Sequence, residues 1–379
     1  MNNKTRPENR SGQVPVNKEA QLHDVIKIAV DVHLRTYVVG RQIGQSAPQP
    51  PQRMPREQFV KWVERQRQLA HEVHVCYEAG CFGFVLAREL LAIGVHVYVI
   101  APRDWEESGK GRNKTDKRDT RAMLRGLDQW LNGDTKALTV VRIPGVEEEQ
   151  RRAESRLRDQ MLGHRKALQA QGRSHLLLRG ISVRGRWWAP RSWERLKVRL
   201  NPILAEHLER LRSVILVTNQ QVNQLTLKLE QAAGAVARPR GLGAMSSEII
   251  DREIMDYGRF KNSRQVGSYF GMCPGEDSSG PRRRMLAITK HGNPRLRCLV
   301  VEAVWRFLQF QPDYWALRKW RGQICQKANP GRSKKAVVAV ARNLACDLWK
   351  LKTGRAKPED LGIRMNPAPN QESAAHTNN

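Results

Sequence analysis

The chain has 379 residues, enough for two or three domains, because single hydrophobic cores usually stop growing at about 250–300 residues. Its 66 Lys and Arg against 37 Asp and Glu give a formal net charge of +29, spread from Arg6 to Arg364. Such a field attracts polyanions, whereas no segment approaches the roughly 20 apolar residues that span a membrane, and residues 1–19 lack a signal-peptide core. We therefore expect a nucleic-acid partner and no membrane.

The six cysteines form no CxxC pair and have no histidines at zinc-finger spacing. We expect them to be reduced core thiols of a cytoplasmic protein. Both ends of the chain, residues 1–20 and residues 353–379, are expected to be disordered, because the outermost stretches are rich in Asn, Gln, Ser and Pro.

Residues 22–145 are predicted to form an α/β domain. Two β-branched runs, residues 25–33 and 36–43, are separated by only two residues and should pair as a hairpin. Residues 44–55 contain four prolines and can hold at most an edge strand. The remaining predicted elements are helices over residues 56–70, 82–93 and 115–126 and strands over residues 73–78, 95–100 and 138–143. An antiparallel opening followed by alternating helix and strand is the element order of ribonuclease-H-like nuclease folds.

Residues 146–235 are predicted to be helical. Residues 146–179 are dense in Glu, Arg and Gln, and a second long helix follows Pro202. Apolar residues repeat along it in alternating steps of four and three, which places them on one seam: Leu204, Leu208, Leu211, Ile215, Thr218, Val222, Leu225 and Leu229. This pattern indicates either a self-associating coiled coil or an amphipathic helix packed on its own domain.

Residues 236–352 are predicted to form a mostly α-helical C-terminal domain. Gly241 and Gly243 flank a predicted tight turn before a helix. Closely spaced glycines let backbone N–H groups approach phosphates, as in hairpin motifs that grip DNA, although an ordinary loop has the same composition.

Four acidic residues of the first domain could hold metal ions. Asp31 and Glu78 each end a predicted strand, and Asp116 and Asp119 lie three residues apart on one helical face. Phosphodiester cleavage uses such clusters because two divalent ions stabilise both the attacking and the leaving oxygen. Hard oxygen ligands favour Mg²⁺, with Mn²⁺ as an alternative. Asp116 and Asp119 could instead cap the helix, but an acid closing an apolar strand, as Asp31 does, is costly to bury without a partner.

Three sequence blocks in this region, "IAVDVHLRT", "YEAGCFGFVLARELLAIGVHVYVIAP" and "KGRNKTDKRDTRAML", resemble the DEDD transposases of insertion sequences. That family carries Asp, Glu, Asp and Asp, in this order, in a RuvC-like nuclease domain. The resemblance implies that Asp31, Glu78, Asp116 and Asp119 are the metal-binding quartet. It also implies that Lys114 and Lys117 contact phosphate.

The block "GRFKNSRQVGSYFGMCPGEDSSGPRRRMLAITKHGNPRLRCLVVEAVWR" is similar to the C-terminal transposase domain of the same family, which carries a nucleophilic serine. The candidates are Ser279, which we prefer, and Ser278; a polar turn is the other interpretation of these residues. Attack by a serine conserves the bond energy of the phosphodiester, and it needs positive charge nearby. That charge would come from Arg282, Arg283, Arg284 and Lys290, while Asn293 or Arg297 could position phosphate.

The resemblance implies a transposase that cuts and rejoins donor and target DNA as a homo-oligomer, a dimer or a tetramer. It also implies a structured guide RNA encoded by the mobile element. The alternatives are a junction-resolving nuclease that uses water and a catalytically inactive nucleic-acid-binding protein. Four aromatic residues could stack on unpaired bases or belong to the core: Trp187, Trp188, Tyr269 and Trp305.

Overall fold

The computed structural model describes residues 22–102, 116–234, 236–279, 282–325 and 330–366. The chain divides into two compact units, Met1–Gly145 and Val146–Asn379, and each has its own core. Of the predicted disordered ends, residues 1–20 and 367–379 lie outside the described residues.

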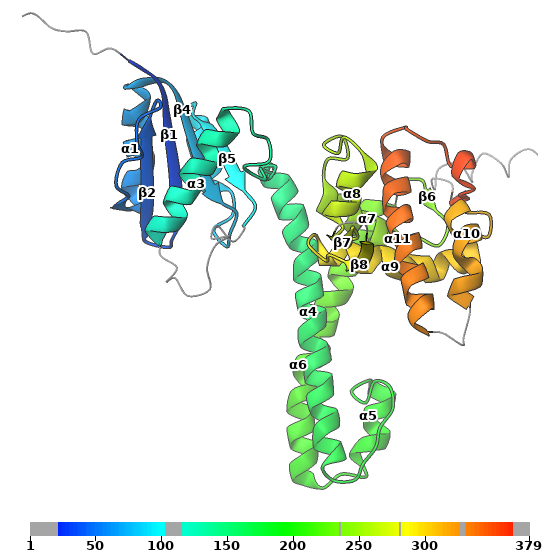
Figure 1. Cartoon of the computed structure of the whole chain (residues 1–379). Helices are drawn as coiled ribbons and strands as arrows, with labels where there is room; N and C mark the ends of the chain where they lie inside the picture. Colours follow the sequence, from blue (N-terminus) through cyan, green and yellow to red (C-terminus); the bar gives the residue numbers. More distant parts are fainter. Residues whose placement is uncertain (1–21, 103–115, 235, 280–281, 326–329, 367–379) are drawn as a thin grey trace, which may run out of the picture. The chain divides into compact units, whose positions relative to one another are not determined.

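The N-terminal unit is built on a five-stranded sheet with the strand order β3-β2-β1-β4-β5 (Figure 1). Its strands are β1 (His23–Asp31), β2 (Thr36–Ile43), β3 (Gln52–Pro55), β4 (Ala70–Glu78) and β5 (His96–Ile100). β1, β2 and β3 pair antiparallel, whereas β4 and β5 run parallel to β1. The predicted hairpin is therefore confirmed, and so is the short edge strand after the prolines.

Helices cover both faces of this sheet. α1 (Arg56–Arg67) and α2 (Val85–Ala92) pack on one face, and α3 (Asp116–Leu131) packs on the other. Neighbouring residues of β1 alternate between these two cores, so Ile28 lies in the first and Ala29 in the second. Because both faces are buried, the central strands are mostly apolar, although β1 contains the buried Lys27 and β4 the buried His74.

The predicted strand over residues 138–143 is wrong. Val140 forms a single antiparallel bridge with Ile100, flanked by the hydrogen bonds Ala101 N to Thr139 O (2.9 Å) and Val141 N to Val99 O (2.7 Å). β5 is only five residues long, so the segment has little strand beside which to pair. Leu138 is nevertheless buried against α3, which explains the apolar pattern.

The C-terminal unit begins with a helical hairpin, in which α4 (Val146–Leu177) and α6 (Pro202–Ala233) lie side by side (Figure 1). The predicted seam of α6 is largely buried within the chain, with Leu208, Ile215 and Leu229 inaccessible to solvent. The amphipathic interpretation thus accounts for the seam.

The connection between these helices contains α5 (Pro190–Lys197). Trp187 and Trp188 are buried here, so they belong to the core and are not platforms for stacked bases. Trp187 also closes over Gly172 of α4, where an added Cβ would lie 2.1 Å from the indole ring.

The rest of this unit is mainly helical, as predicted. Its elements are β6 (Arg238–Pro239), α7 (Ala244–Ile254), α8 (Ser263–Tyr269), β7 (Pro274–Ser279), β8 (Arg282–Ile288), α9 (Pro294–Phe310), α10 (Trp315–Cys325), α11 (Pro330–Lys352), η1 (Glu359–Leu361) and β9 (Met365–Asn366). The prediction that disorder begins at residue 353 is wrong for residues 353–366. Leu361 and Ile363 are buried in the core, and β9 pairs with β6.

The cysteine prediction holds in part. All six thiols are free, but only Cys76 and Cys346 are buried, whereas Cys81, Cys298 and Cys325 are exposed. Within the described part of the chain, no helix is both long enough and apolar enough to cross a membrane.

Candidate active site

The carboxyl ends of two neighbouring parallel strands bring Asp31 and Glu78 together. Val30 of β1 is in register with Tyr77 of β4, and the two acids follow one residue later on each strand. Both line a cavity of about 180 Å³ that continues along residues 79–83. The crevice beyond the carboxyl ends of parallel strands is the usual ligand site of such sheets.

The other two predicted acids lie in the first turn of α3, which packs on β1. His33 joins this helix to the strand, because its Nε2 is 3.3 Å from Asp31 Oδ2 and 3.7 Å from Asp116 Oδ2. One ligand atom each from Asp31, His33 and Asp116 lies within 4.8 Å of the others. Such a spacing suits groups that share a cation.

The pKa of Asp31 reflects the negative charge of the neighbouring acids. Burial raises the pKa of its carboxyl group, and His33 opposes that increase. The charges of Asp116, Asp119 and Glu78 raise the pKa further, so all three act on the same carboxylate. The structure thus brings Asp31 and Asp116 within reach of a shared cation and places Glu78 in the same cavity as Asp31, while the charge of Asp119 also acts on Asp31. A divalent cation there would relieve this repulsion.

Sequence reasoning did not single out two basic residues of this site. One is His33, and the other is Arg53 of β3, whose guanidinium lies 3.3 Å from Asp116 Oδ2. The only available signal was that His33 follows Asp31 by two residues. Lys117 is exposed in the first turn of α3, and Lys114 lies outside the described residues.

Ser278 and Ser279 are the last two residues of β7, in the C-terminal unit. They pair in register with Arg283 and Arg282 of β8, so the predicted polar turn is a strand at both serines. Arg284 of β8 is exposed, and so is Lys290, which follows the strand with a φ of +59°. The backbone thus sets two arginines directly opposite the two serines.

Two predicted phosphate-positioning residues hold the base of this β-hairpin. Arg297 donates hydrogen bonds to the carbonyl oxygens of Phe270 (3.0 Å) and Lys290 (3.4 Å). Asn293 caps α9 through its Oδ1 and donates its Nδ2 hydrogen to Glu253 Oε2 at 2.7 Å. Arg297 therefore ties the segments before β7 and after β8 to α9, and Asn293 ties the start of α9 to α7.

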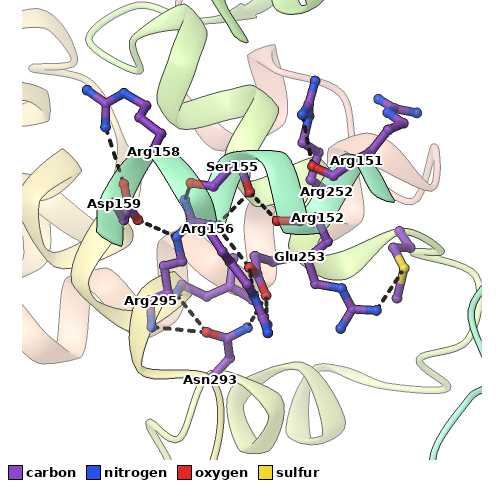
Figure 2. Close-up of polar contacts among 12 residues, drawn as sticks. Arg151, Arg152, Ser155, Arg156, Arg158, Asp159, Arg252, Glu253, Asn293 and Arg295 are labelled. Carbon is purple, nitrogen blue, oxygen red and sulfur yellow. Dashed lines mark hydrogen bonds and ion pairs between the residues drawn. The ribbon is translucent and has the colours of Figure 1, made fainter. Parts of the chain in front are cut away.

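Glu253 is the centre of a buried ionic cluster that sequence reasoning missed (Figure 2). Arg156 of α4 donates two hydrogen bonds to its carboxylate, at 2.9 and 2.8 Å, and Arg295 of α9 donates a third at 3.0 Å. Arg295 also bonds to Asp159 (2.6 Å) and to both the hydroxyl and the carbonyl of Ser155 (2.7 Å each).

The pKa of Glu253 reports the balance of charge in this cluster. Burial by itself would raise the pKa, but Arg156, with Asn293 and Arg295, lowers it to about 2. The carboxylate is therefore ionised although its side chain is inaccessible to solvent. Its function in the fold is to join α4, α7 and α9.

An open hollow of about 520 Å³ lies beside this cluster, lined by Arg152, Arg156, Tyr269, Gly292, Asn293, Pro294 and Arg295. The hydroxyl of Tyr269 donates to the carbonyl oxygen of Glu253 (2.8 Å), and Arg259 lies 4.3 Å from the centre of its ring. Tyr269 is thus held in place by contacts on two sides. Trp305, by contrast, is half exposed.

The family model described as "Transposase IS116/IS110/IS902 family" matches residues 235–320. A relative named putative transposase y4rJ, from Sinorhizobium fredii, is 30% identical over 305 residues, which are 73% of this chain and 76% of the relative. The chain belongs to the IS116/IS110/IS902 family of transposases. The predicted resemblance to insertion-sequence transposases is confirmed at this level.

Two other transposases match a similar share of this chain at lower identity. The transposase for insertion sequence element IS1111A of Coxiella burnetii is 25% identical over 70% of this chain and 74% of its own length. The transposase for insertion sequence element IS1533 of Leptospira borgpetersenii is 23% identical over 74% of this chain and 85% of its own length. Within this IS116/IS110/IS902 transposase, the family match contains the β7–β8 hairpin and α9, whereas the four acids lie outside it.

Proposed function

We propose that this transposase is a Mg²⁺-dependent DNA recombinase that cleaves and rejoins strands through its four acids and Ser279. The observation that carries the proposal is the approach of one ligand atom each from Asp31, His33 and Asp116 to within 4.8 Å of the others, beside the cavity that Asp31 and Glu78 line. Acids that repel one another in a cavity at the end of a sheet are typical of sites tuned for chemistry.

The donor set fits hard divalent cations, because it consists of carboxylate oxygens with one nearby imidazole. Asp31, Glu78, Asp116 and Asp119 would hold the ions, with Mn²⁺ as the alternative to Mg²⁺. Bound there, the ions would supply charge stabilisation for the attacking and leaving oxygens of a phosphodiester. His33 and Arg53 orient Asp116 and offset part of the negative charge. Lys114 and Lys117 are proposed to contact the DNA phosphates.

Ser279 is the proposed nucleophile, with Ser278 as the alternative. Attack of its hydroxyl oxygen on phosphorus forms a serine–phosphate bond and frees one DNA hydroxyl. A hydroxyl of the new partner strand can reverse the step, so rejoining needs no ATP. The register of Ser279 with Arg282, and of Ser278 with Arg283, supports this assignment because the attacked phosphate is anionic.

The fold and the charge support two further parts of the proposal. The strand order β3-β2-β1-β4-β5, with an antiparallel opening and parallel β4 and β5, supports a ribonuclease-H-like, RuvC-like domain. The net charge of +29 is compatible with holding a structured guide RNA together with donor and target DNA. We further propose that a dimer or tetramer carries out the reaction.

The decisive experiment is a denaturing gel of end-labelled element DNA after incubation with the protein and Mg²⁺. We expect a protein-sized shift that disappears in Ser279→Ala, or in Ser278→Ala if that residue attacks, and that disappears in EDTA. Ser268→Ala is the matched control, because Ser268 is an exposed serine of α8 in the same unit. An adduct that persists in the double variant Ser278→Ala/Ser279→Ala would exclude the serine mechanism.

The second candidate function is a junction-resolving nuclease that uses water, and it rests on the same four acids. It predicts cleaved DNA with free ends and no adduct in the same gel. Cleavage that requires Asp31 and Mg²⁺ but neither serine would favour this candidate.

A further inference from the structure

Two imidazoles and a carboxylate meet at the other end of the sheet from the acidic site. His74 of β4 is in register with His96 of the neighbouring parallel strand β5. Their rings stack with centroids 4.7 Å apart and planes inclined by 17°. Glu72 precedes His74 by two residues on the same face of β4, and its Oε2 lies 2.9 Å from His74 Nε2.

We propose that Glu72, His74 and His96 form a site for a transition-metal ion of the Zn²⁺ class. One ligand atom of each lies within 4.8 Å of the others. Tetrahedral Zn²⁺ with bonds of about 2.0–2.1 Å needs its ligand atoms about 3.4 Å apart, so a movement of about 1.4 Å at most closes the site. Glu72 and His96 are exposed and can rotate, whereas His74 is buried and serves as the fixed point.

The surroundings of His74 favour a metal ligand. Its Nδ1 lies 3.1 Å from the hydroxyl of Tyr98, which is the kind of outer partner that fixes the tautomer and the ring orientation of a ligating histidine. Binding would replace the contact with Glu72 and leave Nδ1–H to donate to Tyr98. Both rings then keep a nitrogen lone pair for the ion, which imidazole and carboxylate ligands suit.

One nearby cation could oppose binding. Lys27 of β1 is in register with His74 on the other side of β4. Its ammonium group, however, donates to Asp128 of α3 and to the carbonyl oxygen of Gly44 at 3.1 Å. The lysine is thus held by these two acceptors, although its charge still acts on His74 and helps to lower the pKa of that imidazole, which favours the neutral, metal-binding form.

The ion would connect β4 to the edge strand β5. β5 is five residues long, and its other neighbour contributes only the bridge at Val140. A bond across the two strands would therefore help to hold a short edge strand of the sheet. This function is independent of the acidic site, because Glu78 lies six residues further along β4.

The test uses the full, untagged chain, stripped of metal and titrated with Co²⁺ in excess Mg²⁺, which saturates oxygen-rich sites. We expect one Co²⁺ per chain with the strong visible absorption of four-coordinate, nitrogen-ligated cobalt, which Zn²⁺ displaces. His96→Ala and Glu72→Gln, both at exposed positions, should each weaken binding at least tenfold. Tyr98→Phe should weaken it by about tenfold while keeping the absorption spectrum.

His71→Ala is the matched control, because His71 is exposed on the same strand but faces the opposite side of the sheet. It should bind Co²⁺ as the unaltered chain does. Absence of the nitrogen-ligated spectrum would overturn the proposal, and so would equal affinity in His96→Ala. Loss of binding in His71→Ala would also contradict it, because the ligand would then be a different histidine.

Discussion

Asp31 and Glu253 are both acids withdrawn from water, and burial acts in the same direction on both. Burial raises the pKa of Asp31, and three further acids raise it more. At Glu253 the neighbours are arginines and an asparagine, and the pKa falls to about 2 in spite of complete burial. The Asp31 side chain is 25% exposed and that of Glu253 is inaccessible to solvent, so the lower pKa of the more buried acid comes from the groups that surround it.

The surrounding charges suit the two clusters to different roles, a cation-binding site at Asp31 and a structural contact at Glu253. The cluster around Glu253 is balanced within the protein, so it needs no ligand to be stable. The cluster around Asp31 has an excess of negative charge, and a cation or a proton stabilises it. Negative charges that repel one another, as around Asp31, are typical of a ligand-binding or catalytic site, whereas paired charges, as around Glu253, are typical of a structural ion-pair cluster.

The largest expected effect comes from Asp31→Asn. We expect recombination to fall about a thousandfold, because the proposed metal ions would contribute several kcal/mol of transition-state stabilisation. The melting temperature in EDTA should stay the same or rise, because the substitution removes one of four like charges. A plasmid excision assay and thermal denaturation measure the two effects.

Asp24→Asn is the control for this variant, since Asp24 is exposed on the same strand β1 at its other end. It should leave both measurements unchanged. If Asp31→Asn unfolded the protein, Asp31 would belong to the scaffold and the comparison would fail.

Glu253→Gln, unlike Asp31→Asn, should lower the stability of the protein. We expect the free energy of unfolding of the C-terminal unit to fall by about 3 kcal/mol, because removing one partner leaves buried arginine charge without compensation. Urea denaturation followed by tryptophan fluorescence measures this, since Trp349 lies in that unit. An unchanged midpoint would show that the cluster contributes nothing to stability.

The stability that Glu253 contributes should depend on pH, because its pKa differs between the folded and the unfolded chain. The folded-state pKa of Glu253, about 2, lies below its ordinary value of 4.5, so its stabilisation is complete above about pH 4.5 and is lost as the pH falls towards 2. The difference in unfolding free energy between the unaltered chain and Glu253→Gln should therefore shrink over this window, by up to about 3 kcal/mol. A difference independent of pH would mean that the carboxylate is not ionised in the folded state.

The smallest effect is expected at Glu206→Gln. Glu206 pairs with Arg210 at 2.7 Å on the exposed surface of α6, where both side chains are more than 60% accessible. Water screens such a pair, so we expect no measurable shift of the midpoint in the same urea assay. A loss as large as that of Glu253→Gln would show that burial does not set the strength of these ion pairs.

The strand and helix positions of three acids could be predicted from the sequence, whereas their assignment as a metal-binding set came from the family resemblance and stays a prediction. Asp31 and Glu78 close apolar strands, and Asp116 begins a helix, so local order alone predicts where their side chains emerge. The strand predicted over residues 138–143 failed because strand pairing depends on the length of the partner, and β5 is distant in the sequence.

The Glu253 cluster could not be predicted in this way. Arg156 and Glu253 are 97 residues apart, and Arg156 and Arg295 are 139 apart, so no local pattern relates them. A chain rich in arginine offers too many candidate pairs. The packing of α4, α7 and α9 determines which of these pairs forms.

The buried cluster around Glu253 also anchors the helical hairpin formed by α4 and α6. At 1.5 Å per residue, the 32 residues of α4 extend about 48 Å, and Arg156 anchors its early part to α7 and α9. Asn293, at the start of α9, bonds to Glu253, and Arg297 holds Phe270 and Lys290 on either side of β7 and β8. The same cluster therefore fixes both the helical hairpin and the start of α9, so a substitution that weakens it would loosen α4 and α9 together.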